Sequence, residues 1–155
     1  MKRGPAFWLA TWFGCGLVPR APGTAGAVGA LAVAWPLAFS AHLQPFWFAV
    51  LALVFLLPAI HSATVVANGL GVKDPQIVVV DEVVGQWLTL AGATRLNPVS
   101  FGLALILFRT FDIWKPPPIR RIEQLRAGTG IVLDDAMAGV YGAAILYLLG
   151  RFNLY

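Results

Sequence analysis

The sequence predicts an all-α protein, a polytopic membrane helix bundle with about four to five membrane-embedded helices and a polar site at the cytoplasmic boundary. Hydrophobic residues make up 59% of the chain, and the mean hydropathy is +0.77. Charged residues make up only 12%, about half the share of roughly 25% in soluble domains. Residues 21–72 contain no Asp, Glu, Lys or Arg. A soluble protein needs charge on its outer faces, so we expect lipid around this chain.

The length and the lack of internal repeats predict one domain over residues 1–155. Cys15 is the single cysteine, which excludes an intramolecular disulfide. The basic start at Lys2 and Arg3 precedes an apolar run that glycines interrupt, so we interpret it as retained and not as a cleaved signal. The net charge of +4 is concentrated in residues 115–126. This clustering is typical of a juxtamembrane loop, and no nucleic-acid-binding module is recognisable.

The first half of the chain predicts a loop and two helices. Residues 14–26 (GCGLVPRAPGTAG) are rich in Gly and Pro and predict a loop. Thr24 is a suitable N-cap for a helix that ends near residue 41, and its glycines would allow close helix packing. The uncharged run 45–60 would span only about 24 Å as a helix, so we expect it to continue past His61.

The second half predicts three more helices. Asp74 and Pro75 are a suitable N-cap and first residue for a helix over 74–93. Residues 98–112 predict the next helix, and WKPPPIRR after it predicts a loop or short turn. The last helix is expected from Thr129 or Gly130 to Gly150. If all five span, the basic loops share the side of the N-terminus, which the positive-inside rule makes cytoplasmic.

Two pairs of adjacent acids interrupt the most apolar segments. Asp81 and Glu82 lie within IVVVDEVVGQWLTLAG, and Asp134 and Asp135 lie within GIVLDDAMAGVYGAAILYLL. Burying such charges costs several kcal/mol unless a cation or donor compensates them. An interfacial charged turn or compensation of the helix dipole are the ordinary explanations. Paired acids without a His or Cys pattern instead favour a hard cation, Mg²⁺ rather than Zn²⁺.

Two further motifs carry groups that suit a phosphate. In FRTFDIWKP, Arg109 and Asp112 are three residues apart, where an intrahelical ion pair is common, and Lys115 follows. Arg109 and Lys115 could bind a phosphate while Asp112 helps to hold a metal. In VPRAPGTAG, a Gly-rich turn leads into a helix N-terminus, which favours anions; it carries Arg20, Gly23 and Thr24.

Taken together, these motifs resemble the phosphatidylglycerophosphatase A family. The matching segments occur in the family order, and they are PRAPGTAG (19–26), Lys73–Asp74, DEVVGQW (81–87), FRTFDIWKPPPI (108–119) and GIVLDDAMAG (130–139). The resemblance implies a Mg²⁺-dependent enzyme of the bacterial inner membrane, multi-pass, with its active site facing the cytoplasm. It also implies the reaction, hydrolysis of phosphatidylglycerophosphate to phosphatidylglycerol and inorganic phosphate in phospholipid biosynthesis.

These observations lead to a set of expected residue roles. We expect one or two Mg²⁺ ions on Asp81, Glu82, Asp134 and Asp135, assisted by Asp74 or Asp112. The catalytic set is completed by Arg109 and Asp112, and we expect the phosphate to be bound by Arg20, Gly23, Thr24 and Lys115. One carboxylate would act as the general base, and Glu123 is expected to be a bystander.

Several alternatives stay open at this point. Water attack and an aspartyl-phosphate intermediate are both compatible with the motifs. A phosphatase for another lipid or prenyl phosphate would share them, and an ion or phosphate transporter could also carry intramembrane acids. The expected partners are the substrate and membrane lipids, with no nucleic acid and no obligate protein partner.

Overall fold

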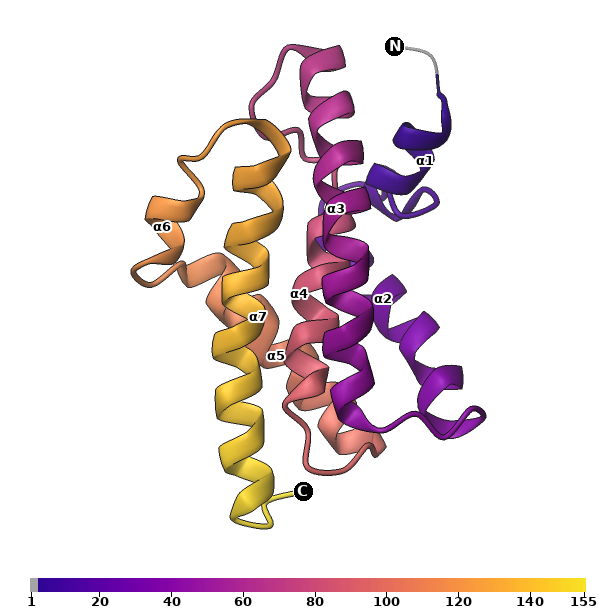
Figure 1. The fold of residues 1–155 in the computed structure, drawn as a ribbon, viewed down its shortest axis with the longest axis vertical. Coiled ribbons are helices and arrows are strands. Elements are labelled where there is room, and N and C mark those ends of the chain that lie inside the picture. The colour runs from indigo at the N-terminus through magenta and orange to yellow at the C-terminus, as the bar shows by residue number, and fades with distance from the viewer. Residues whose placement is uncertain (1–2) are drawn as a thin grey trace.

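The computed structural model describes residues 3–155, and the regular structure within that range is entirely helical. Lys2, one of the basic residues noted at the start of the chain, lies outside this range. The elements in chain order are α1 (Pro5–Ala10), the 3-10 turn η1 (Cys15–Leu17), α2 (Pro22–Phe39), α3 (Pro45–Leu70), α4 (Val80–Ala91), α5 (Pro98–Trp114), α6 (Ile119–Ile122) and α7 (Ala127–Arg151). The long helices form an elongated bundle (Figure 1). The expected all-α fold is confirmed.

Helix α4 is the central element of the bundle. It packs against α2, α3, α5 and α7, and ten of its twelve residues are buried. Trp87 fixes it to α2, because its indole Nε1 donates to the carbonyl of Ala30 at 3.1 Å. Twelve residues span only about 18 Å, so α4 is too short to cross a hydrocarbon core of about 30 Å. It is instead a short helix enclosed by longer ones.

Three helices are long and apolar enough to cross a membrane. They are α2 with 18 residues, α3 with 26 and α7 with 25. Helix α3 extends well past His61, as its length predicted, and ends at Gly71, whose left-handed backbone (φ 66°) terminates it. Helices α4 and α5 complete the bundle between these three. The result is an all-α membrane bundle in which the helices differ in length.

Glycines bring α4 and α7 into backbone contact. A Cβ added to Gly139 of α7 would lie 2.4 Å from the carbonyl oxygen of Gly85 on α4. A Cβ on Gly85 would in turn lie 2.6 Å from the carbonyl oxygen of Asp135. Thr89 crosses the same contact, since its hydroxyl lies 3.0 Å from the Gly85 carbonyl and 3.2 Å from that of Gly139. Only glycine permits this approach, which holds the acidic segments of the two helices together.

Three expected helix starts are wrong. Asp74 and Pro75 lie in the loop before α4, which begins six residues later at Val80. The N-terminal segment holds this loop in place: the Val79 N–H donates to the Ala10 carbonyl at 2.8 Å, and Gly16 packs against the carbonyl of residue 77. Thr24 is inside α2, which begins at Pro22 with Ala21 as N-cap, and α7 begins at Ala127. The short turn α6 after the proline run agrees with the sequence.

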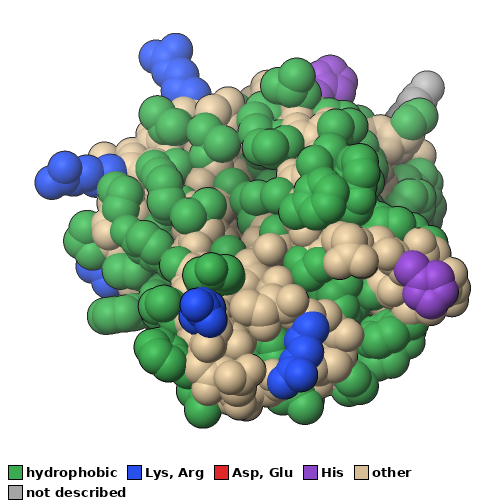
Figure 2. Space-filling view, turned by 60° about the horizontal axis from the view of Figure 1, so that its bottom comes forward, with side chains coloured by type: hydrophobic (Ala, Val, Ile, Leu, Met, Phe, Trp, Pro, Cys, Tyr) green, Lys and Arg blue, Asp and Glu red, His purple; other side chains and the backbone are tan. Residues whose placement is uncertain are grey.

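Charge is distributed unevenly between the two ends of the bundle. Figure 2 shows the end where α3 begins and α7 finishes; its visible surface is mainly apolar, with scattered basic and histidine side chains and no acid among the described residues. The chain's acids gather instead where α4 and α7 begin and where α5 ends. The fold therefore separates an apolar end from a polar one.

Candidate active site

A cavity of about 1090 Å³ opens where the ends of the bundle helices meet. Its walls come from the segment leading into α2, the loop between α3 and α4, the first turn of α4, the end of α5, the α6 region and the start of α7. All seven carboxylates of the chain line this cavity, together with five basic residues, Arg20, Lys73, Arg109, Lys115 and Arg120. The acids therefore outnumber the cations by two, which favours the binding of an added cation.

Three buried carboxylates converge on one point of the cavity. Oxygens of Asp81, Glu82 and Asp135 all lie within 4.8 Å of one another. One oxygen of each, Oδ1 of Asp81, Oε2 of Glu82 and Oδ2 of Asp135, is buried without a hydrogen-bond partner among the described residues. Buried acids without partners strongly destabilise a fold unless a cation or protons compensate them. Oxygen donors of this kind suit Mg²⁺, so the three residues fit a divalent cation.

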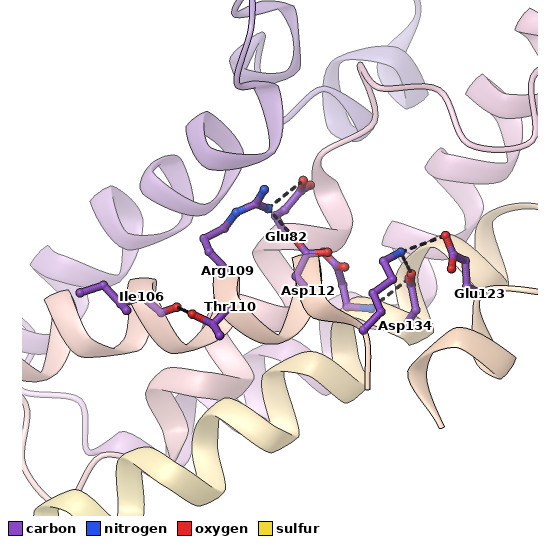
Figure 3. A network of polar contacts seen from close by, with 9 residues as sticks. Glu82, Ile106, Arg109, Thr110, Asp112, Glu123 and Asp134 are labelled. Atoms are coloured by element: carbon purple, nitrogen blue, oxygen red, sulfur yellow. Dashed lines mark hydrogen bonds and ion pairs between the residues drawn. The ribbon is translucent and has the colours of Figure 1, made fainter. Parts of the chain in front are cut away.

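Arg109 links this cluster to α5. Its Nη1 lies 2.5 Å from Oδ2 of Asp112 and 3.6 Å from Oε1 of Glu82. Figure 3 shows Arg109 extending between these two acids. The Arg109–Asp112 spacing of three residues places both side chains on one face of α5, as predicted. The guanidinium is thus held beside the cluster, where it can meet an anion.

Lys115 forms a second cationic centre, just after the end of α5. Its Nζ lies 2.6 Å from Oδ2 of Asp134 and 3.0 Å from Oε1 of Glu123. Burial alone would lower the pKa of Lys115, but the hydrogen bonds and charges of these two acids outweigh burial and raise the pKa above its ordinary value. Lys115 therefore stays protonated. The two acids lie to one side of the Arg109 group in Figure 3.

The start of α2 forms another part of the cavity wall. A Cβ on Gly23 would lie 2.3 Å from Oε1 of Glu82 and 2.9 Å from Nη1 of Arg109. Gly23 therefore allows the first turn of α2 to lie directly against the Glu82–Arg109 pair. Arg20, with a left-handed backbone (φ 71°), and Thr24 also line the cavity. The first turn of a helix leaves N–H groups unpaired, which favours an anion beside it.

The structure brings every residue expected in the site to this cavity but separates the second acidic pair. Asp135 joins Asp81 and Glu82, whereas Asp134 pairs with Lys115. Adjacent residues on a helix point about 100° apart, and the ion pair with Lys115 holds the Asp134 carboxylate away from the cluster. Asp112 is held by Arg109. Asp74 lines the cavity from the loop before α4, and burial raises its pKa.

The sequence interpretation did not identify two side chains of this region. Glu123, expected to be a bystander, lines the cavity and pairs with Lys115. Gln86 is fully buried on α4, and neither atom of its amide has a hydrogen-bond partner among the described residues. Its spacing of four residues from Glu82, on the same helix face, is the signal that could have indicated it.

Comparison with known proteins gives a consistent result. A sequence model of the family described as phosphatidylglycerophosphatase A matches residues 8–150. The phosphatidylglycerophosphatase A of Escherichia coli K12 is 33% identical over 161 residues, covering 95% of this chain and 84% of that protein. The protein of the same name from Haemophilus influenzae is 36% identical, covering 97% of this chain and 91% of that protein.

A third relative carries a different name. A Bacteroides thetaiotaomicron protein, provisionally named a phosphatidylinositol-3-phosphatase, is 38% identical over 155 residues, covering 94% of this chain and 95% of that protein. No solved structure matches the chain. All three relatives are named as phosphatases of phospholipids, but the substrates in their names differ.

Proposed function

Because this chain belongs to the phosphatidylglycerophosphatase A family, we propose that it hydrolyses the terminal phosphate of phosphatidylglycerophosphate, giving phosphatidylglycerol and inorganic phosphate. It is a phosphoric monoester hydrolase, and its place is in phospholipid biosynthesis. The observation that carries the proposal is the cavity itself: a buried triad of acids beside two fixed cations, at one end of an apolar bundle.

The acid triad would hold the metal. Asp81, Glu82 and Asp135 offer converging oxygens, three of which are buried and unpaired among the described residues. When bound there, Mg²⁺ supplies positive charge that polarises a phosphoryl oxygen and acidifies water. The excess of acids over cations in the cavity supports this assignment, because a phosphate dianion would otherwise enter a site that is already negative.

The cationic residues would bind the phosphoryl group. Arg109 and Lys115 are each fixed by an acid, Asp112 and Asp134 respectively, so their charged ends are positioned before substrate arrives. Arg20 and the first turn of α2, at Gly23 and Thr24, also line the cavity and would contact the same phosphate. Together these groups offset the charge that spreads over the phosphoryl oxygens in the transition state.

Hydrolysis then requires two proton transfers, one from the attacking water and one to the leaving glycerol oxygen. The oxygen of a water molecule forms a bond to phosphorus, and the bond from phosphorus to the glycerol oxygen breaks. A carboxylate of the cavity accepts one proton of the water, and the carboxyl group so formed supplies the proton that turns the leaving glycerol oxygen into an alcohol. Buried carboxylates suit the first role, since desolvation makes them stronger bases.

We also propose that the protein lies in the bacterial inner membrane with this cavity facing the cytoplasm. Six basic residues lie in the segments at the cavity end of the bundle, which precede α2, join α3 to α4 and join α5 to α7. They are Arg20, Lys73, Lys115, Arg120, Arg121 and Arg126. Arg95 and Arg151, at the opposite ends of α4 and α7, are the basic residues of the other side. This bias supports the orientation through the positive-inside rule.

The test is phosphate release by the purified protein in detergent. We expect activity with Mg²⁺, loss of it with a chelator, and recovery when Mg²⁺ is returned; turnover that persists in the chelator would overturn the metal assignment. Asp81→Asn and Asp135→Asn should each lower kcat by roughly 100-fold or more, because each removes a charged ligand. Arg151→Gln, a charge change at the far end of α7, serves as the control. Near wild-type turnover in both acid variants would refute the site.

Phosphatidylinositol 3-phosphate is the second candidate substrate, because the Bacteroides relative carries that name. The same assay distinguishes the two lipids by the ratio of their kcat/KM values. We expect phosphatidylglycerophosphate to be preferred, since two of the relatives are named for that activity. A higher kcat/KM for the inositol lipid would reverse the assignment of substrate while leaving the phosphatase chemistry intact.

A further inference from the structure

The rim of the cavity is apolar although its interior is charged. Leu17, the last residue of η1, and Val18 after it line the cavity, as do Ile113 and Trp114 at the end of α5. All four side chains are exposed, Ile113 to 73%. We name these four residues the apolar rim. Arg20 and Arg120 line the same cavity, so positive charge lies near this apolar surface.

A phosphate ion or a sugar phosphate would gain little binding free energy from the apolar rim, because neither carries hydrocarbon that could be buried there. Exposed apolar side chains are common on a membrane bundle, but beside a charged cavity they suit a ligand that carries both an anionic group and hydrocarbon. The cations of the cavity require an anionic group on that partner, and the apolar rim requires hydrocarbon attached to it. One molecule meets both conditions if it is an amphipathic phosphate ester whose phosphate enters first.

We propose that the apolar rim is the passage for the membrane-embedded part of a phospholipid phosphomonoester, its glycerol backbone and the first methylenes of its acyl chains. This inference rests on the proposed function and adds the residues that select a lipid over a soluble ester. The phosphate reaches Arg109 and Lys115 inside the cavity, while the apolar rim contacts the start of the chains.

The physical reason is the path of the substrate. A lipid whose phosphate enters the cavity lifts part of its apolar body out of the bilayer, and each square ångström that then meets water costs about 25 cal/mol. Apolar walls remove that cost, whereas polar walls impose it. The rim should therefore matter for long-chain substrates and not for the deacylated headgroup.

Helix α5 provides a matched pair of variants for the test. Ile113→Ser changes the rim, and Ile106→Ser changes the same residue type two turns earlier on the same face, where the side chain is 63% exposed and does not line the cavity. Ile106 is visible on α5 away from the acids in Figure 3. Phosphate release is measured for long-chain phosphatidylglycerophosphate and for its water-soluble, deacylated headgroup.

Ile113→Ser should lower the ratio of kcat/KM for the lipid over the soluble headgroup by roughly threefold to tenfold, since a partly covered side chain loses part of its burial energy. Leu17→Ser, far in sequence from Asp112 and Lys115, should lower the ratio in the same direction. Ile106→Ser should leave the ratio unchanged. An unchanged ratio in both rim variants, or an equal fall in Ile106→Ser, would overturn the proposal.

A binding measurement separates this proposal from the proposed function. The fluorescence of Trp114 is obtained as the difference between the wild type and Trp114→Phe. Acyl chains that carry bromine quench a tryptophan that they contact. With the metal chelated, brominated phosphatidylglycerophosphate in nanodiscs should quench this difference more than brominated phosphatidylcholine at the same mole fraction. Equal quenching would refute the passage even if hydrolysis occurs, and stronger quenching without hydrolysis would refute only the proposed reaction.

Discussion

The contact between α4 and α7 makes a sharp prediction about how packing controls the site. In Gly139→Ala, the new Cβ would lie 2.4 Å from the Gly85 carbonyl oxygen and 2.9 Å from its Cα. Ordinary contact is about 3.5 Å, so α7 must move away from α4 by about 1 Å. Overpacking of this kind typically destabilises a protein by about 1–3 kcal/mol.

The same displacement should affect chemistry. Asp135 lies one turn before Gly139 on α7, and Asp81 lies one turn before Gly85 on α4, so the contact is directly beneath the acid triad. Metal ligands tolerate displacements of only about 0.2 Å, and a misplacement of 1 Å can reduce a rate by about 100-fold. We therefore expect Gly139→Ala to lose most activity while retaining its helix content.

Phosphate release and thermal unfolding in detergent check this prediction together. Gly102→Ala on α5 is the matched control, because a Cβ there meets nothing within 4 Å. It should keep wild-type activity and gain stability by up to about 1 kcal/mol from its higher helix propensity. If Gly139→Ala has the unfolding temperature and the rate of phosphate release of the wild type, the close contact does not position the acids, and the prediction is refuted.

Two further predictions concern single contacts. Glu123→Gln removes one of the two carboxylates that hold Lys115, so KM should rise severalfold with a smaller change in kcat; a wild-type KM would show that Asp134 alone positions the lysine. Trp87→Phe removes the hydrogen bond between α4 and α2, which should lower the free energy of unfolding by about 1 kcal/mol. Its kcat should stay near wild type, and a large loss of kcat with intact stability would contradict this structural role.

The sequence predicted the helices and the gathering of the acids in one site because the signals for both were local. A pair of carboxylates inside a long apolar run indicates function whatever the fold, and the uncharged stretches were long enough to identify α2 and α3. The start of α4 was wrong because the N-terminal segment holds the preceding loop, and no local pattern encodes that contact.

The different positions of the acids within the site also depend on contacts between residues that are distant in sequence. Asp134 and Asp135 are indistinguishable in the sequence, but only Asp135 faces α4, and Asp134 meets Lys115. Glu123 reaches the same lysine because Lys115 adopts a left-handed conformation (φ 47°) at the end of α5 and the chain then turns back through α6. Such a reversal follows from loop geometry, which spacing rules do not describe.

The direction of the helices explains why so many charges can share one cavity. Helices α2, α4 and α7 begin at the cavity, and α5 ends there. Helix N-termini carry partial positive charge and stabilise anions by about 0.3–1 kcal/mol each, while a C-terminus favours a cation. Asp81 and Glu82 occupy the first turn of α4, and Lys115 caps α5. The alternating directions of these helices thus create an end suited to carboxylates and phosphate, and the short α4 begins there with both of its acids buried.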